Sequence, residues 1–138
     1  MKTQSNKVFA GNIWKFGCNW EAYETSFYNF MKDEQIVIGR VKWRYSAGDL
    51  VAITEGFTVK AIVMVEEEPR AITENSSYKF ITEKYNIAYE DATIYAKAEW
   101  YQLPEEEIFQ YQVRRGAARV RKPDIKETVL KLWNGRNK

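Results

Sequence analysis

The sequence predicts a small α+β domain in which a bent, mostly antiparallel β-sheet or small barrel is flanked by two or three helices. β-Branched segments follow one another closely and are separated by short turn sequences. Other segments carry apolar residues at helical spacing. Neither a repeat nor a linker interrupts the 138 residues, so we expect residues 1–138 to form one domain with its own core.

The first strand and the first helix are expected near the N-terminus. The segment "KVFAGNIWKF" holds aromatic and β-branched residues around a glycine, which predicts a strand with a turn or bulge. Aromatic residues then recur at spacings of three and four, which predicts a helix over residues 20–32. Asn19 suits its N-cap, because an asparagine oxygen can accept a free backbone N–H of the first turn.

Three consecutive strands are expected in the middle of the chain, in "QIVIGRVKWRY", "DLVAITEG" and "FTVKAIVMVEEE". Residues 46–49 and 55–57 would supply the turns between them. The segment "ENSSYKFITEKYNI" predicts a short helix capped by Ser76 or Ser77.

The last two elements are a strand and a helix. The segment "ATIYAKAEWYQL" alternates between two faces, so Trp100 and Tyr101 point to opposite sides and at most one of them can reach a binding site. The segment "PDIKETVLKLWNG" begins with proline and stops at glycine, which predicts a helix with Trp133 in the core.

Composition argues against several kinds of catalysis. The chain has no histidine, which removes the commonest general base and the commonest zinc ligand. No P-loop, dinucleotide-binding or zinc-ligand pattern is present. Cys18, the single cysteine, therefore lacks a base partner, and we interpret it as a small buried hydrophobe. We expect no catalytic residue, no metal and no cofactor.

The segment lengths and the cysteine count also predict a location. No apolar run approaches the length of a membrane span, and "MKTQSNK" carries no signal region. One cysteine cannot form an internal disulfide, which fits a reducing compartment. We expect a cytoplasmic protein without membrane contact.

Two segments suggest contact with nucleic acid. Trp43 lies in "KWRY", where aromatic rings alternate with cations as on surfaces that stack on bases. Residues 114–122 hold five basic residues in a chain of net charge +2, and they form either a solvated hairpin or a phosphate-binding segment. The phosphate-binding candidates are Arg114, Arg115, Arg119, Arg121 and Lys122.

The order of "IWKF", "NW" and "IVIGRVKWRYSAGDLVAITEGFTVKAIVMVEEEP" resembles the PUA-like superfamily, and within it the EVE-like and YTH-like domains that bind modified bases. The matching features are Trp14, the helix after Asn19, Trp43, the Gly-Asp turn at residues 48–49, and Gly56 with Val59. The first half of the chain matches best, and "FGC" stands where EVE-like domains have "SEP".

The resemblance implies a PUA-like β-barrel with an aromatic pocket for an extruded base. We expect base contacts at Asn19, Trp20, Trp43, Tyr45, Thr54, Gly56, Phe57 and Thr58, and the resemblance itself places residues 54–58 near a base. Other interpretations stay open, because Asn19 also fits a helix cap, Trp20 a core position and residues 54–58 an ordinary hairpin.

We therefore expect a monomer that reads a modified or flipped base in DNA or RNA without catalysis. Any effector, such as a nuclease, would be encoded separately. Two alternatives come from other classes. One is an ASCH-like enzyme of the same superfamily that acts on RNA or a nucleoside and uses Lys, Tyr and Glu in place of histidine. The other is a protein-interaction module whose aromatic surface meets a partner chain.

Overall fold

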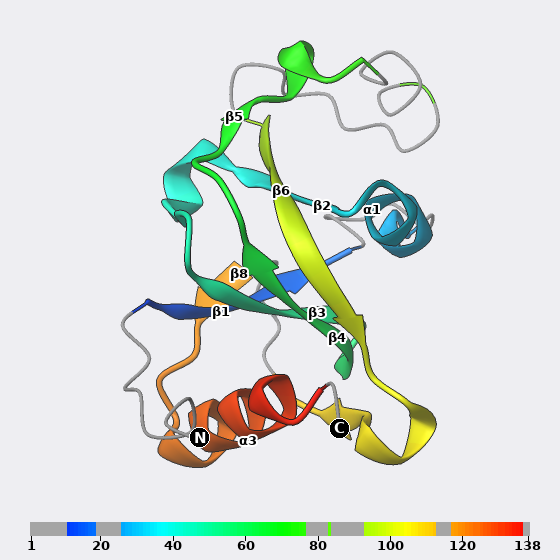
Figure 1. The fold of residues 1–138 in the computed structure, drawn as a ribbon, viewed down its shortest axis with the longest axis vertical. Coiled ribbons are helices and arrows are strands. Elements are labelled where there is room, and N and C mark those ends of the chain that lie inside the picture. Colours follow the sequence, from blue (N-terminus) through cyan, green and yellow to red (C-terminus); the bar gives the residue numbers. More distant parts are fainter. Residues whose placement is uncertain (1–10, 19–25, 77–82, 84–92, 113–116, 137–138) are drawn as a thin grey trace.

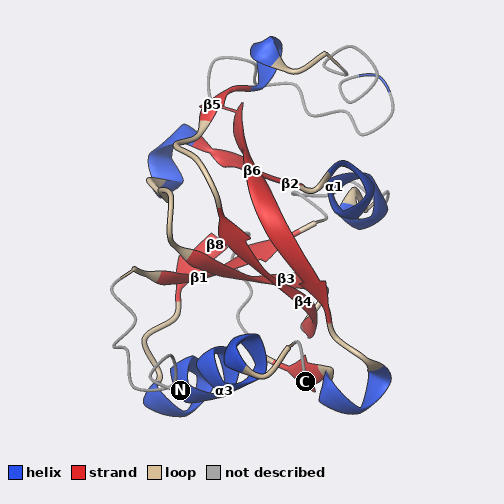
Figure 2. Ribbon diagram, in the orientation of Figure 1, coloured by secondary structure: helices blue, strands red, loops and turns tan. Residues whose placement is uncertain are grey.

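A computed structural model describes residues 11–18, 26–76, 83, 93–112 and 117–136 of the chain. Within these ranges the fold is α+β, a curled and mostly antiparallel sheet with two helices (Figures 1 and 2). The strands are β1 (Ile13–Gly17), β2 (Ile36–Arg40), β3 (Leu50–Glu55), β4 (Thr58–Val65), β5 (Arg70–Ala71), β6 (Thr93–Gln102), β7 (Phe109–Gln110) and β8 (Ala117–Arg119). The helices are α1 (Tyr28–Glu34) and α3 (Pro123–Asn134), with 3-10 turns η2 (Val41–Trp43), η3 (Ile72–Glu74) and η4 (Glu105–Glu107).

The long strand β6 pairs with different strands along its length, and the curled sheet is built around it. The strand order is β2-β6-β4-β3-β1-β8, with β5 on β6 and β7 on β4. Tyr95 of β6 pairs with both Ile38 of β2 and Arg70 of β5, so these two strands lie along opposite edges of β6. The second half of β6 pairs with β4 instead. The pairing of β1 with β3 is parallel, and the other described pairings are antiparallel.

Apolar side chains pack on both faces of the sheet. Successive residues of β3 point to opposite sides, so Val51 and Ile53 join the cluster that contains residues of α1. Leu50 and Ala52 join the cluster that contains residues of α3. In the view of Figure 1, α3 lies below β1 and β3, and α1 lies to the right of β6.

The structure confirms the predicted C-terminal helix. Pro123 stands in the first turn of α3 and Gly135 caps its end, and Trp133 is buried. Proline suits the first turn of any helix, because the backbone N–H groups of that turn have no partner within the helix and proline has no N–H to leave unpaired.

The first helix begins later than predicted. Helix α1 starts at Tyr28, so the prediction is wrong for residues 26 and 27. The backbone N–H of Phe27 donates to the carbonyl of Cys18 (3.0 Å) instead of joining a helix. Residues 19–25, including the expected cap Asn19 and the ring of Trp20, lie outside the described residues. So does nearly all of the short helix expected in "ENSSYKFITEKYNI".

The strand predicted over "QIVIGRVKWRY" is shorter than expected. Strand β2 ends at Arg40, a 3-10 turn follows, and Arg44 takes a left-handed conformation with φ of 57°. Trp43 therefore stands on a turn and folds back toward β1. The two predicted turns are confirmed, with left-handed Gly48 and Gly56 at φ of 90° and 61°. In the described parts of the chain, no helix is both long and apolar enough to cross a membrane.

Candidate functional site

Four aromatic side chains from β1 and from the segment after β2 pack against one another, and we call them the aromatic stack: Trp14, Phe16, Trp43 and Tyr45. Phe16 is at its centre, with ring centroids of Trp43 at 4.8 Å, Tyr45 at 5.0 Å and Trp14 at 5.9 Å. The tilted and edge-on angles suit the charge distribution of aromatic rings, which stabilises each pair by about 0.5–1.5 kcal/mol.

Gly39 forms the floor on which the stack rests. A Cβ atom at this position would lie 2.8 Å from Cε1 of Tyr45 and 2.9 Å from Cε3 of Trp43. Real Cβ atoms do not approach other atoms so closely, so the rings pack where they do because residue 39 has no side chain. A lone glycine inside a β-branched run is the sequence signal for such an approach.

The two residues of "KWRY" that carry rings differ in exposure. Tyr45 is buried, its hydroxyl lies 3.4 Å from the carbonyl oxygens of Val37 and Ile94, and burial raises its pKa. The structure thus places Tyr45 in the core, where it supports the stack, and not on the surface as expected. Trp43 is half-buried and its sequence neighbours Lys42 and Arg44 are exposed, so part of the residue and both flanking cations are accessible to solvent.

Strand β8 brings a third cation to the aromatic stack. Arg119 pairs with Trp14 across the β1–β8 ladder, and its guanidinium carbon lies 5.5 Å from the Trp14 ring centroid. The same guanidinium donates to Oδ1 of Asn12 (2.8 Å). A cation over an indole face is attracted by the ring electrons. Arg121 and Lys122 are exposed between β8 and α3, whereas Arg114 and Arg115 lie outside the described residues.

Asp49 holds the other side of Trp14. Its carboxylate is buried and accepts from the Trp14 indole N–H (3.0 Å), from the backbone N–H of Asn12 (2.9 Å) and from that of Ser46 (3.0 Å). Three donors satisfy a carboxylate that would otherwise be costly to bury. The sequence predicts Asp49 only as a turn residue, and its link to Trp14 depends on the parallel pairing of β1 with β3.

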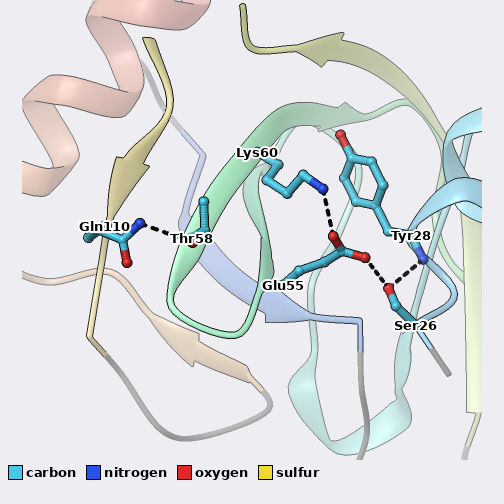
Figure 3. Close-up of polar contacts among 6 residues, drawn as sticks. All are labelled: Ser26, Tyr28, Glu55, Thr58, Lys60 and Gln110. Carbon is cyan, nitrogen blue, oxygen red and sulfur yellow. Dashed lines mark hydrogen bonds and ion pairs between the residues drawn. The ribbon is translucent and has the colours of Figure 1, made fainter. Parts of the chain in front are cut away.

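A second polar group lies at the β3–β4 hairpin, and we call it the hairpin cluster: Ser26, Tyr28, Glu55 and Lys60. Figure 3 shows how the four side chains meet. Lys60 Nζ lies 2.6 Å from Glu55 Oε1 and 4.8 Å from the Tyr28 ring centroid. The Ser26 hydroxyl donates to Glu55 Oε2 (2.5 Å) and accepts from the Tyr28 backbone N–H (3.1 Å).

A β-bulge brings Lys60 into this cluster. Ile53 pairs with Ala61 and Thr54 with Val59, so Lys60 is the extra residue on β4. A bulge re-aims the side chain of its extra residue, which here meets Glu55. The sequence shows two opposite charges flanking a hairpin, but the register shift that brings them together has no sequence signal.

Burial at and beside the hairpin cluster shifts the pKa values of Tyr28 and of the neighbouring Cys18. Burial raises the pKa of the fully buried Cys18 thiol, and Glu55 raises it further. Burial, with the charge of Glu55, raises the pKa of Tyr28 to about 12. The Tyr28 hydroxyl is buried without a hydrogen-bond partner in the described part of the chain. Cys18 is thus a protonated core residue, as expected.

The lowered pKa of Glu55 predicts that the stability of the fold depends on pH. Burial alone would raise its pKa, but hydrogen bonds from Lys60 and Ser26 outweigh burial and hold the pKa below its ordinary 4.5. The carboxylate therefore stabilises the fold above about pH 4.5, and this contribution is lost as the pH falls through the folded-state pKa. We expect the Glu55→Gln protein to lose less stability than the wild type between about pH 5 and pH 3, measured by urea denaturation.

The control for this measurement is Glu127→Gln, since Glu127 is an exposed carboxylate of α3. Removing an exposed charge changes stability little, so the control should follow the wild-type pH profile. Equal pH profiles for Glu55→Gln and the wild type would contradict the assignment.

The other expected contacts on the β3–β4 hairpin differ in exposure. Thr54 is buried, and its hydroxyl lies 3.5 Å from the carbonyl of Phe16, so the structure places it in the core. Gly56 and Phe57 are exposed at the tip. The hydroxyl of Thr58 accepts from Gln110 Nε2 (2.9 Å; Figure 3). The tip is therefore accessible while the strand below it is not.

Strand β1 connects the two groups. Trp14 and Phe16 lie in the aromatic stack, and Cys18, just after the strand, is close enough to Glu55 and Lys60 for their charges to act on its thiol. Nowhere in the described ranges do three or more His, Cys, Asp or Glu side chains gather as metal ligands would. No protein-family model matches the chain, and no curated protein or solved structure matches it either.

Proposed function

We propose that this chain binds DNA or RNA through the aromatic stack and accepts a modified or flipped base there, without catalysis. The observation that carries the proposal is the half-buried ring of Trp43, which packs on Phe16 and stands between the exposed cations Lys42 and Arg44. Arg119 adds a cation at the far end of the same stack. The curled sheet with its two helices is compatible with the PUA-like barrel that the sequence resemblance implies.

The energetics of base binding agree with such a surface. Extruding a base from a duplex costs a few kcal/mol, which the binding site must recover. Stacking on an aromatic side chain is worth about 1–3 kcal/mol per base. The Trp43 ring is already held by Phe16 and by the floor at Gly39, so little conformational entropy is lost when a base stacks on it.

Removing the Trp43 ring should abolish base selectivity. We expect the wild type to bind an oligonucleotide with a modified base more tightly than its unmodified counterpart. Trp43→Ala should lower affinity for the modified oligonucleotide by roughly 5- to 150-fold, the equivalent of one lost stacking contact. Fluorescence anisotropy at fixed salt with a panel of modified DNA and RNA measures both effects, and circular dichroism checks the fold.

Variants of Lys42, Arg44 and Arg70 separate phosphate contact from base contact. Lys42→Ala and Arg44→Ala should each weaken binding to all sequences and reduce the salt dependence by about one phosphate contact. Arg70→Ala removes a cation that already pairs with Glu67 and should change neither. Equal affinity for every oligonucleotide in the panel, whether modified or not, would contradict the proposal.

The hairpin cluster favours a second candidate function, an ASCH-like enzyme that acts on RNA or a nucleoside. It joins a lysine, a carboxylate and a hydroxyl by direct hydrogen bonds, beside a tyrosine ring. Such groups can transfer protons without histidine. Turnover of a labelled nucleoside or RNA that disappears in Glu55→Gln would support this function, and substrates that stay intact with every added metal would exclude it.

A further inference from the structure

The Glu55–Lys60 pair is held at both ends by further contacts with residues at the start of α1 and just before it. Ser26 fixes the second oxygen of the Glu55 carboxylate, and the Tyr28 ring lies beside the ammonium group of Lys60. The side chains of Glu55 and Lys60 are 31% and 34% exposed, so one side of the pair faces solvent. The pair therefore presents charged groups in a fixed arrangement that a ligand can reach.

Both charged groups keep hydrogen-bonding capacity. A lysine ammonium has three N–H donors, and the described contacts of Lys60 use one on Glu55 and direct another side at the Tyr28 ring. A carboxylate can accept about four hydrogen bonds, and Glu55 accepts one from Lys60 and one from Ser26. A donor and an acceptor thus remain side by side.

The charges of the pair limit the kind of ligand. An anion such as phosphate would be repelled by Glu55, and a metal ion would be repelled by Lys60. A neutral group with an N–H donor next to a carbonyl or ring-nitrogen acceptor satisfies both. Nucleobase edges carry this pattern. The exposed ring of Phe57, at the tip of the same hairpin, is the one large exposed hydrophobic side chain in the described residues.

We infer that Glu55 and Lys60 form a hydrogen-bonding site for the edge of a nucleobase, separate from the aromatic stack on which a base would rest. This inference depends on the proposed function for its choice of nucleobases among neutral planar ligands. Base binding would replace solvent at the open side of the pair, while Ser26 and Tyr28 keep the pair in place.

The test titrates the four common nucleosides into the ¹⁵N-labelled protein and follows the backbone amides of residues 54–60. We expect at least one nucleoside to shift these amides, and ribose and inorganic phosphate to leave them unchanged. Lys60→Met and Glu55→Gln should each weaken the binding by about tenfold, because each removes a hydrogen bond to a charged group. Glu127→Gln, which changes an exposed carboxylate of α3, should bind like the wild type.

The amide spectra also show whether each variant is folded, and Glu55→Gln, which keeps the size of the side chain, carries the test if Lys60→Met unfolds. Nucleosides that leave residues 54–60 unshifted, or that bind the variants as tightly as the wild type, overturn the inference. Oligonucleotide binding that depends on Trp43 but not on Glu55 or Lys60 also overturns it, and leaves the proposed function standing. Nucleoside binding here without any oligonucleotide binding overturns the proposed function alone.

Discussion

Replacing Asp49 by alanine is expected to lower the free energy of unfolding by on the order of 3–5 kcal/mol, because three N–H donors lose their common acceptor. The donors are the Trp14 indole and the backbone amides of Asn12 and Ser46. The site is buried, so water cannot replace the carboxylate without opening the structure. Urea denaturation at neutral pH, followed by tryptophan fluorescence, measures the loss.

Two further variants separate this mechanism from a general effect of removing a carboxylate. Asp49→Asn keeps one acceptor oxygen but turns an NH₂ group toward donors, so it should fall between alanine and the wild type. Asp33→Ala removes an exposed carboxylate from α1 and should change stability by less than about 0.5 kcal/mol. If Asp49→Ala were as stable as Asp33→Ala, the Asp49 carboxylate would not stabilise the contact between β1 and the start of β3.

Replacing Gly39 by alanine should have the second large effect. The added methyl group would lie under 3.0 Å from the rings of Tyr45 and Trp43, and 3.1 Å from Cε2 of Phe16. Overpacking of this kind costs about 1–3 kcal/mol. Tyr45 is enclosed by the core, so we expect the half-buried Trp43 to move, which should weaken oligonucleotide binding together with stability.

A double variant tests whether the clash is with Trp43. In Trp43→Ala one of the rings that crowd residue 39 is gone and those of Tyr45 and Phe16 remain, so adding Gly39→Ala should cost less there than in the wild type, although not nothing. The comparison uses the free energies of unfolding of the two single variants, the double variant and the wild type. Strictly additive losses would show that the Trp43 ring does not rest on Gly39.

Much of the fold can be predicted from the sequence because the signals are local. The helix of residues 123–134 is marked by proline, glycine and apolar spacing, and the turns at Gly48 and Gly56 by residues that tolerate left-handed backbone. The helix over residues 20–32 is harder to place, because a hydrogen bond from Phe27 to Cys18, which is part of the tertiary structure, competes with the helix at residue 27.

The candidate site could be predicted only in part. The exposure of Lys42 and Arg44 around Trp43 follows from the alternation of charged and aromatic residues. The burial of Tyr45 and Thr54 does not, because it depends on which strand lies opposite. The hairpin cluster was missed for the same reason, since Glu55 and Ser26 are far apart in the sequence.

The sequence by itself determined the class of the fold and most of its strands and turns, since backbone preferences and the period of apolar residues act over a few residues. Only the tertiary structure decided how those elements form sites. The β1–β3 pairing brings Asp49 under Trp14, the bulge turns Lys60 toward Glu55, and the missing side chain at Gly39 lets three rings converge. Each depends on contacts between segments that meet only when the sheet has curled, and such contacts have no local sequence signal.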